Sequence, residues 1–240
     1  MKRAADPAAP PGLEALARRH GLSPDQAAAL ARMLLALATE PAPPTRLRAV
    51  DEALGGHLAD SLAGLAVAEL ARASRIADLG AGVGFPGLAL AAALPRAQVD
   101  LVEATARKCA VIERLIAAAE LPNARVLAQR AEELAVSEGR AAYTAVTTRA
   151  LAALPVLVEY AAPLLRTGGV LVAWKGRRGA DEEAAGSRAA VEVGLAPSRV
   201  VAVTPFEGAH SRHLHVFTKT AQTPARFPRR AGVALKRPLG

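Results

Sequence analysis

The stretch Asp78-Leu79-Gly80-Ala81-Gly82-Val83-Gly84-Phe85-Pro86-Gly87 decides the fold of this 240-residue chain. It follows a short β-type run at 76–79 and opens a helical run at 86–94. Glycine has no Cβ, so a glycine-rich backbone can bend sharply and come close to a ligand. A plain turn needs one or two glycines, and this stretch has four. We therefore interpret it as the ligand-binding turn after the first strand of an open α/β sheet.

Strand-like and helical runs alternate from residue 75 onward. Strands are predicted at 76–79, 99–102, 125–127, 145–148 and 170–174, and helices at 86–94, 106–120, 131–137, 154–165 and 181–193. Two more strands, 200–203 and 214–219, are joined by a loop too short for a helix, so they should form an antiparallel hairpin. This alternation predicts a parallel sheet with helices on both faces. The fold class is therefore α/β, a seven-stranded Rossmann-like sheet of the class I methyltransferase type with an antiparallel C-terminal hairpin.

Residues 1–74 predict a helical N-terminal extension. A short amphipathic helix is expected at 13–19, and Ser23-Pro24-Asp25-Gln26 combines a cap, a first-turn proline and an early carboxylate that open a helix to about Ala38. The prolines of 41–44 end it, and a third helical stretch covers 50–71, which Gly55-Gly56 can interrupt. The chain then divides into this extension, a cofactor-binding domain at 75–220 and a basic C-terminal tail at 221–240.

Composition excludes several classes of protein. With 52% hydrophobic and 22% charged residues, the chain can bury a full core and is not globally disordered. No apolar run is long enough to span a membrane, and the N-terminal residues 1–7 contain no apolar signal core, so we expect a cytoplasmic protein. The single cysteine, Cys109, rules out an internal disulfide and a multi-cysteine metal cluster, and we expect no metal site.

The chain is strongly basic, with a net charge of +8 and an isoelectric point near 10.5. Such a balance favours a polyanion as partner. Five basic residues and no acidic one lie from residue 226 to the end, namely Arg226, Arg229, Arg230, Lys236 and Arg237. Charge alone leaves two readings of this tail equally open, a solvated segment or a contact for nucleic acid.

A carboxylate, Glu103, stands at the end of the second predicted strand, 23 residues after Gly80. At that place it can accept hydrogen bonds from both hydroxyls of an adenosine ribose. The segment Gly82–Gly87 also satisfies the G-x-G-x-x-G pattern of dinucleotide enzymes, so the motif alone fits a methyl donor and a dinucleotide equally. A dehydrogenase needs a further substrate domain, and the terminal hairpin leaves little room for one. The rest of the chain therefore favours a methyltransferase.

Further blocks carry a resemblance to a known family. They are Gly84-Phe85-Pro86-Gly87, 57–62, Leu101-Val102-Glu103 with Arg107-Lys108, 130–133, 148–150, 164–169, 174–176, 212–214 and 227–232. In this order, from about residue 45 onward, the chain resembles the bacterial small-subunit ribosomal RNA guanine-N7 methyltransferases, the glucose-inhibited division protein B family. It departs from the pattern at Glu103, where many members carry Asp.

The resemblance implies S-adenosyl-L-methionine as cofactor and 16S ribosomal RNA or the small ribosomal subunit as partner. We expect a monomer, and the sequence itself leaves the oligomeric state open. It implies that Gly80 and Phe85 line the cofactor, that Glu103, Ala104 and Thr105 lie at its ribose, and that Ala131 and Glu132 lie beside its adenine. Gly82 and Gly84 complete the turn, and Arg149 is a further cofactor residue rather than a surface arginine that starts a helix. Candidate RNA contacts are Lys175, Arg177, Arg178 and Arg212, together with Arg226, Arg229, Arg230, Lys236 and Arg237 of the tail.

Transfer to guanine N7 requires little from the protein except alignment, because N7 carries a lone pair and no proton. The sequence contains no motif for a general base or a nucleophile, which fits this chemistry, and we assign no catalytic residue. The place of the Asn/Asp-Pro-Pro-aromatic block of exocyclic amine methyltransferases reads Thr147-Thr148-Arg149-Ala150, and Cys109 lies in a helical run as a core residue rather than a nucleophile. His210, His213 and His215 suggest a polar or RNA-facing strand rather than a metal site, and Trp174 a core position.

Three alternatives stay open. The same fold can methylate another RNA or a protein, and a nucleotide-dependent oxidoreductase shares the glycine pattern. A silent RNA-binding protein is disfavoured because the glycines and Glu103 are intact.

Overall fold

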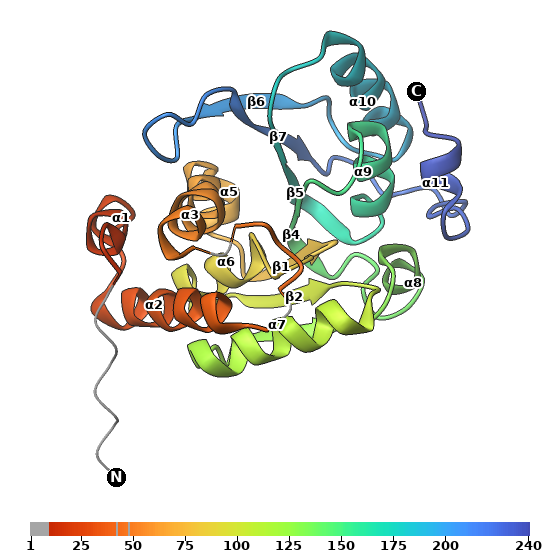
Figure 1. Ribbon diagram of the computed structural model, residues 1–240. Helices are drawn as coiled ribbons and strands as arrows, with labels where there is room; N and C mark the ends of the chain where they lie inside the picture. Colours follow the sequence, from red (N-terminus) through yellow and green to blue (C-terminus); the bar gives the residue numbers. More distant parts are fainter. Residues whose placement is uncertain (1–9, 42, 48) are drawn as a thin grey trace.

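A seven-stranded sheet forms the centre of the computed structural model, which describes residues 10–41, 43–47 and 49–240 (Figure 1). The strands are β1 (Arg75–Leu79), β2 (Gln98–Val102), β3 (Ala124–Leu127), β4 (Tyr143–Arg149), β5 (Leu165–Lys175), β6 (Arg199–Val203) and β7 (Arg212–Thr218). They lie in the order β3-β2-β1-β4-β5-β7-β6. The first five are parallel, and β7 is antiparallel to both β5 and β6. The predicted sheet and its antiparallel hairpin are confirmed.

Helices cover both faces of the sheet. α6 (Gly87–Ala93) and α7 (Ala106–Ala119) share one core cluster with Ile76 and Val99. α9 (Leu154–Ala161) and α10 (Ala180–Glu192) share the other with Ala77, and α8 (Ala131–Ala135) packs against α9. Neighbouring residues of β1 therefore enter opposite layers, as the two-residue period of a strand requires. None of the described helices has the length and apolar character needed to cross a bilayer.

The helix predicted at 154–165 is too long. α9 ends at Ala161, and Leu165 already pairs with Tyr143 as the first residue of β5. The apolar run 154–165 fits a helix and a buried strand equally well, and pairing with β4 decides its end.

The N-terminal extension packs onto the first face of the sheet. It contains α1 (Leu13–Arg19), α2 (Pro24–Thr39), α3 (Val50–Ala53), the π-helical turn η1 (Leu54–Ala59), α4 (Asp60–Leu62), the 3₁₀ turn η2 (Ala63–Ala66) and α5 (Ala68–Ala71). The predicted start of α2 is confirmed, since Ser23 and Gln26 form a reciprocal capping box. Gly55-Gly56 does not break the helical run but lies in η1, and π-helical turns occur frequently at functional sites. Residues 1–9, Ala42 and Arg48 lie outside the described residues, as does the N-terminal part of the signal-sequence prediction.

The C-terminal segment 221–240 is anchored to the core at a few buried residues and is exposed between them. Phe227 and Ala234 are each 2% exposed and belong to the second core cluster, and α11 (Val233–Lys236) contacts α9. Arg229 forms a two-pronged ion pair with Glu159, whose side chain is 1% exposed. The basic residues of this segment therefore have different environments, and one of them neutralises a buried charge.

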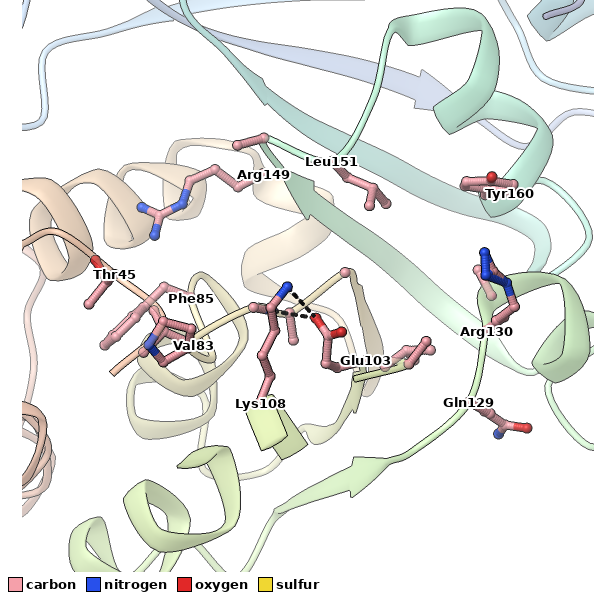
Figure 2. Close-up of a pocket in the computed structure, with 18 of the residues that line it drawn as sticks. Thr45, Val83, Phe85, Glu103, Lys108, Gln129, Arg130, Arg149, Leu151 and Tyr160 are labelled. Atoms are coloured by element: carbon pink, nitrogen blue, oxygen red, sulfur yellow. Dashed lines mark hydrogen bonds and ion pairs between the residues drawn. The ribbon is translucent and has the colours of Figure 1, made fainter. Parts of the chain in front are cut away.

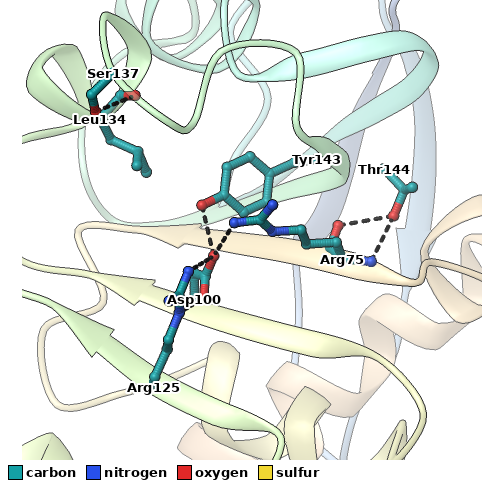
Figure 3. A network of polar contacts seen from close by, with 7 residues as sticks. All are labelled: Arg75, Asp100, Arg125, Leu134, Ser137, Tyr143 and Thr144. Carbon is teal, nitrogen blue, oxygen red and sulfur yellow. Dashed lines mark hydrogen bonds and ion pairs between the residues drawn. The ribbon is translucent and has the colours of Figure 1, made fainter.

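A polar network joins four strands away from the glycine turn (Figure 3). The Asp100 carboxylate on β2 accepts hydrogen bonds from Arg125 at 2.6 Å, from the Tyr143 hydroxyl at 2.7 Å and from Arg75 at 3.2 Å. Burial opposes the charge of Asp100, but the hydrogen bonds from Arg125 and Tyr143 outweigh it and lower the pKa of this carboxyl. The network stabilises the pairing of the four neighbouring strands β3, β2, β1 and β4.

Candidate functional site

A cavity of about 410 Å³ opens at the carboxyl ends of β1, β2 and β4 (Figure 2). It is the place where ligands bind in open α/β sheets. Its walls come from the segments that follow successive strands, from α9, from the N-terminal extension and from the C-terminal segment. The lining residues are Pro44, Thr45, His57, Gly80, Ala81, Gly82, Val83, Phe85, Val102, Glu103, Ala104, Lys108, Gln129, Arg130, Ala131, Glu132, Arg149, Ala150, Leu151, Tyr160 and Leu235.

Eight of the ten predicted cofactor residues lie in this lining, namely Gly80, Gly82, Phe85, Glu103, Ala104, Ala131, Glu132 and Arg149. Gly84 and Thr105 do not. A Cβ on Gly84 would lie 2.3 Å from Leu88 Cδ1, and its φ of +102° is one that other residues rarely adopt. Gly84 therefore lets the turn pack against α6, and Thr105 contributes its backbone N–H to Glu103 at 2.9 Å.

Asp78 links the end of the glycine-rich turn to the neighbouring strand β4. Its carboxylate is fully buried, where Oδ2 accepts the Gly87 N–H at 2.9 Å and Oδ1 accepts the Thr147 hydroxyl at 2.7 Å. Burial raises the pKa of Asp78 to about 7, although both hydrogen bonds act in the opposite direction. The side chain thus joins β1, β4 and the start of α6. Asp78 is the first residue of the glycine-rich stretch, and its role was not predicted from the sequence.

Glu103 presents an ionised carboxylate to the cavity. Its side chain is 6% exposed, and Oε2 accepts the Gly82 N–H at 3.1 Å while Lys108 Nζ lies 3.7 Å away. Burial raises the pKa of Glu103, but hydrogen bonds from Thr105 and Gly82 and the Lys108 charge lower it by more, so it lies below its ordinary value. Each oxygen holds one backbone donor, and a carboxylate oxygen can accept a second. The pair of oxygens can therefore accept two neighbouring hydroxyls.

One end of the cavity is closed by α9 and the C-terminal segment. Glu132 is 7% exposed, and its Oε1 accepts the Gly232 N–H at 2.9 Å. Burial, and then the charge of Glu132, raise the pKa of Tyr160 to about 12, so its hydroxyl stays protonated. Gln129, Tyr160 and Leu235 were not predicted. Only the folded chain brings Tyr160 and Leu235 to the cavity, whereas Gln129 directly follows β3 and its place at that strand end could have indicated it.

The other end is built by the π-helical turn η1 around His57. The imidazole stacks on Phe85 with ring centres 4.8 Å apart and planes 7° from parallel. Arg149 donates to His57 Nδ1 at 3.1 Å, to the Gly56 carbonyl at 3.0 Å and to Asp60 Oδ2 at 2.9 Å. Arg149 is thus tied to the N-terminal extension and is not a surface arginine.

The hydrogen bonds of His57 determine its tautomer. Arginine has no acceptor, so Nδ1 accepts and Nε2 carries the proton, which it donates to Thr45 Oγ1 at 3.0 Å. Burial, and then the Arg149 charge, lower the pKa of His57 to about 4. The imidazole is therefore neutral at physiological pH and keeps this orientation.

A second cavity of about 360 Å³ adjoins the first, and the two share His57, Arg149 and Ala150 in their linings. Asp60, Lys175 and Arg212 are among its further walls. Trp174 also lines it but is 6% exposed, and its Nε1 donates to the Asp60 carbonyl at 2.8 Å, which fits the predicted core position. A ligand in the first cavity and one in the second would thus meet across the His57–Arg149 contact.

The structure separates the predicted RNA contacts into groups. Lys175 and Arg212 line the second cavity, with Lys175 Nζ 2.6 Å from Glu182, and Arg177 is exposed. Arg178 pairs with Glu183 on the surface.

The five basic residues of the C-terminal segment line neither cavity. Arg226 pairs with Glu192 and Arg229 with Glu159, while Arg230, Lys236 and Arg237 are exposed. Position in the sequence could not separate Arg229 from its neighbours, since its partner lies in α9.

Cys109 and the histidines do not form a reactive cluster. The Cys109 thiol is 4% exposed and donates to the Glu103 carbonyl, and burial raises its pKa. His213 Nδ1 donates to the Gly176 carbonyl at 2.9 Å, and His215 is 1% exposed. Within the described ranges, no three histidine, cysteine or acidic side chains converge as metal ligands do.

Comparison with known proteins gives the site a context. The family model described as rRNA small subunit methyltransferase G matches residues 26–214. A protein of Chloroflexus aggregans named ribosomal RNA small subunit methyltransferase G is 45% identical over 186 residues, which cover 76% of each chain.

Solved structures share the fold. A predicted O-methyltransferase from Agrobacterium tumefaciens aligns with a TM-score of 0.51 and 26% identity over 68% of this chain and 81% of its own. A 1,6-didemethyltoxoflavin N1-methyltransferase from Burkholderia thailandensis, solved with S-adenosylhomocysteine bound, aligns with a TM-score of 0.51 and 16% identity over 68% and 79%.

Proposed function

The chain belongs to the rRNA small subunit methyltransferase G family, and on this premise we propose that it transfers a methyl group from S-adenosylmethionine to guanine N7 in 16S ribosomal RNA. The observation that carries the proposal is the junction of the two cavities at His57 and Arg149. The first cavity has the acceptor carboxylate of a nucleoside site, and the second has basic walls suited to RNA. A methyl donor in one would point at a base in the other.

The residues present fit S-adenosylmethionine. The ionised Glu103 carboxylate has lone pairs left for the two ribose hydroxyls, and Ala131 and Glu132 stand at the end where the adenine would lie. Gly80 and Gly82 add no side chain of their own to the cavity wall; a Cβ on Gly80 would meet the wall residue Leu151 at 2.6 Å, and one on Gly82 would meet only a backbone oxygen at 3.8 Å. When bound, the cofactor supplies an electrophilic methyl group on a sulfonium. Glu103, Ala131 and Glu132 would hold its adenosine, which would leave the methyl end toward the shared wall.

The chemistry requires alignment and no proton transfer. Guanine N7 would attack with its own lone pair, and positive charge would pass from sulfur to the base with no need of a general acid or base from the protein. Holding donor and acceptor in line contributes on the order of 7–11 kcal/mol in well-oriented systems. The neutral, doubly hydrogen-bonded His57 and its stack on Phe85 support this reading, because they make the shared wall rigid and uncharged at the ring. A covalent route through Cys109 would need an accessible thiolate, and this thiol is buried with a raised pKa.

A transfer assay tests the proposal. Radiolabelled S-adenosylmethionine is incubated with small ribosomal subunits that lack the modification, with stripped 16S RNA and with large subunits, and label is counted separately in RNA and protein. We expect label in small-subunit RNA only. Label in the protein fraction or in large-subunit RNA would instead support the alternative of another target on the same fold.

We also propose that the enzyme acts as a cytoplasmic monomer. Its substrate is ribosomal RNA, which supports that location. Large exposed hydrophobic side chains among the described residues are Val136, Leu151, Val191 and Leu235, and two of them line the cofactor cavity. This leaves Val136 and Val191 as the large apolar side chains exposed outside that cavity among the described residues, so light scattering coupled to gel filtration should give the mass of one chain; a dimer mass would contradict the proposal.

A further inference from the structure

We propose that Asp60 selects guanine as the acceptor base, by accepting hydrogen bonds from its N1–H and 2-amino groups through Oδ1. The inference rests on the function proposed above and assigns the base to the second cavity. Asp60 was not among the site residues predicted from the sequence.

The two oxygens of Asp60 have different environments. The side chain is 10% exposed and stands at the first position of α4, where Oδ2 accepts Arg149 Nη1 at 2.9 Å. Oδ1 is buried and accepts no hydrogen bond from any described residue. Buried carboxylate oxygens are normally satisfied, so an open acceptor needs an explanation. A ligand that brings its own donors supplies one.

Asp60 lines the second cavity, and its Oδ1 has almost no contact with solvent in the free protein. Arg212 Nε lies 3.7 Å from Oδ1, which is within ion-pair range but beyond hydrogen-bond distance, and Asp60 and Arg212 both line the cavity. The Arg212 side chain is 45% exposed. An exposed side chain can move without disturbing the core, so we expect Arg212 to turn toward a phosphate when RNA binds and to leave Oδ1 open to the base.

The edges of guanine explain why a carboxylate belongs there. N7 and O6 are acceptors on one edge, while N1–H and the 2-amino group are donors on the other. The N7 edge must face the methyl group at the shared wall, so the donors need an acceptor elsewhere in the second cavity. Asp60 is the only carboxylate among the described residues that line it, and Arg149, Lys175 and Arg212 can only donate.

The same carboxylate disfavours adenine. Adenine would turn the lone pair of its N1 toward Oδ1, and two acceptors facing each other leave a buried charge without a partner. A good two-point contact discriminates between bases by roughly 5- to 150-fold. Asp60 thus determines which base is methylated, while the alignment of donor and acceptor determines which atom of that base reacts.

The test crosses a protein variant with a base analogue. Small-subunit RNA is assembled by ligation with guanosine or inosine at the methylated position; inosine keeps N7, O6 and N1–H and lacks only the 2-amino group. We expect the wild-type enzyme to lose roughly 10- to 150-fold in kcat/KM on the inosine RNA, as for one hydrogen bond to a charged group. Asp60→Asn keeps an acceptor for Arg149 but removes the charge, and its two RNAs should differ by less than about threefold.

The controls separate recognition from folding. Asp60→Asn should bind S-adenosylhomocysteine as the wild type does, and Asp51→Asn, an exposed change in α3, should keep the full preference for guanosine. Equal rates on the two RNAs by the wild type would overturn the inference even if the variant did not fold. An unchanged preference in folded Asp60→Asn would also overturn it. Absence of transfer to the guanosine RNA by the wild type would overturn the proposed function itself.

Discussion

Replacement of Glu103 by Gln should separate cofactor binding from the methyl-transfer step. The carboxylate is nearly buried and holds one backbone N–H on each oxygen, so its remaining lone pairs face the cavity. Gln has the same shape but turns one acceptor into a donor. One ribose hydroxyl then loses a hydrogen bond to a charged group, which contributes about 1.5–3 kcal/mol. We expect the Kd for S-adenosylhomocysteine to rise roughly 10- to 150-fold.

Titration calorimetry with S-adenosylhomocysteine measures this effect directly. Glu113→Gln removes the same charge from the exposed face of α7 and should leave the Kd unchanged. Because Glu103 lies away from the shared wall, the rate at saturating cofactor should fall by much less than the affinity. The substitution also removes the charged acceptor of one backbone N–H, which can lower stability. Thermal unfolding of the variant is therefore measured alongside the titration. A Kd for Glu103→Gln within twofold of the wild type would refute the assignment of this carboxylate to the ribose.

Three further predictions concern the fold and the RNA surface. Burial raises the pKa of Asp78 from 3.8 to about 7, so its contribution to stability is complete below pH 4 and is lost as the pH rises through 7. In urea unfolding, the stability of Asp78→Asn relative to the wild type should therefore rise by up to about 4 kcal/mol across this window, and a constant difference would contradict the burial argument. Gly84→Ala should destabilise by about 1–3 kcal/mol more than Gly208→Ala, because both have positive φ but only the first meets a side chain, and equal costs would show that the turn has slack. Arg229→Ala should lower the free energy of unfolding by about 3–5 kcal/mol by leaving a buried glutamate unpaired, whereas Arg230→Ala should keep stability and weaken RNA binding with a shallower salt dependence; the reverse pattern in unfolding and filter-binding assays would reassign the two arginines.

Local patterns in the sequence predicted the cofactor half of the site. Gly80, Gly82 and Glu103 follow the first two strands within a short span, and strand ends in a parallel sheet meet at one edge. Not every glycine of the motif lines the cavity. Gly84 belongs to the same motif, yet its missing Cβ makes room for Leu88 and not for a ligand. A motif identifies the turn and does not say which glycine faces outward.

The acceptor half could not be predicted in the same way. His57 and Asp60 come from the N-terminal extension, and only the packing of that extension on the sheet brings them to Arg149 after β4. Arg149 was predicted from its position, but its three partners were not.

A different signal was present for Arg229. Glu159 is the one charged residue of the apolar helix α9, and a lone carboxylate on a buried helix requires a cation. Such a residue predicts a partner without saying which of several arginines will be close.

Identification of the methylated nucleoside tests the central claim most directly. RNA from small subunits labelled by the enzyme is digested to nucleosides, and the labelled product is compared with authentic standards. If alignment alone is enough for transfer to a ring nitrogen, the label should run with 7-methylguanosine. A 7-deazaguanosine at the target position should then abolish the labelling. Label in N2-methylguanosine or 5-methylcytidine would require a proton acceptor or a nucleophile, and it would contradict the account.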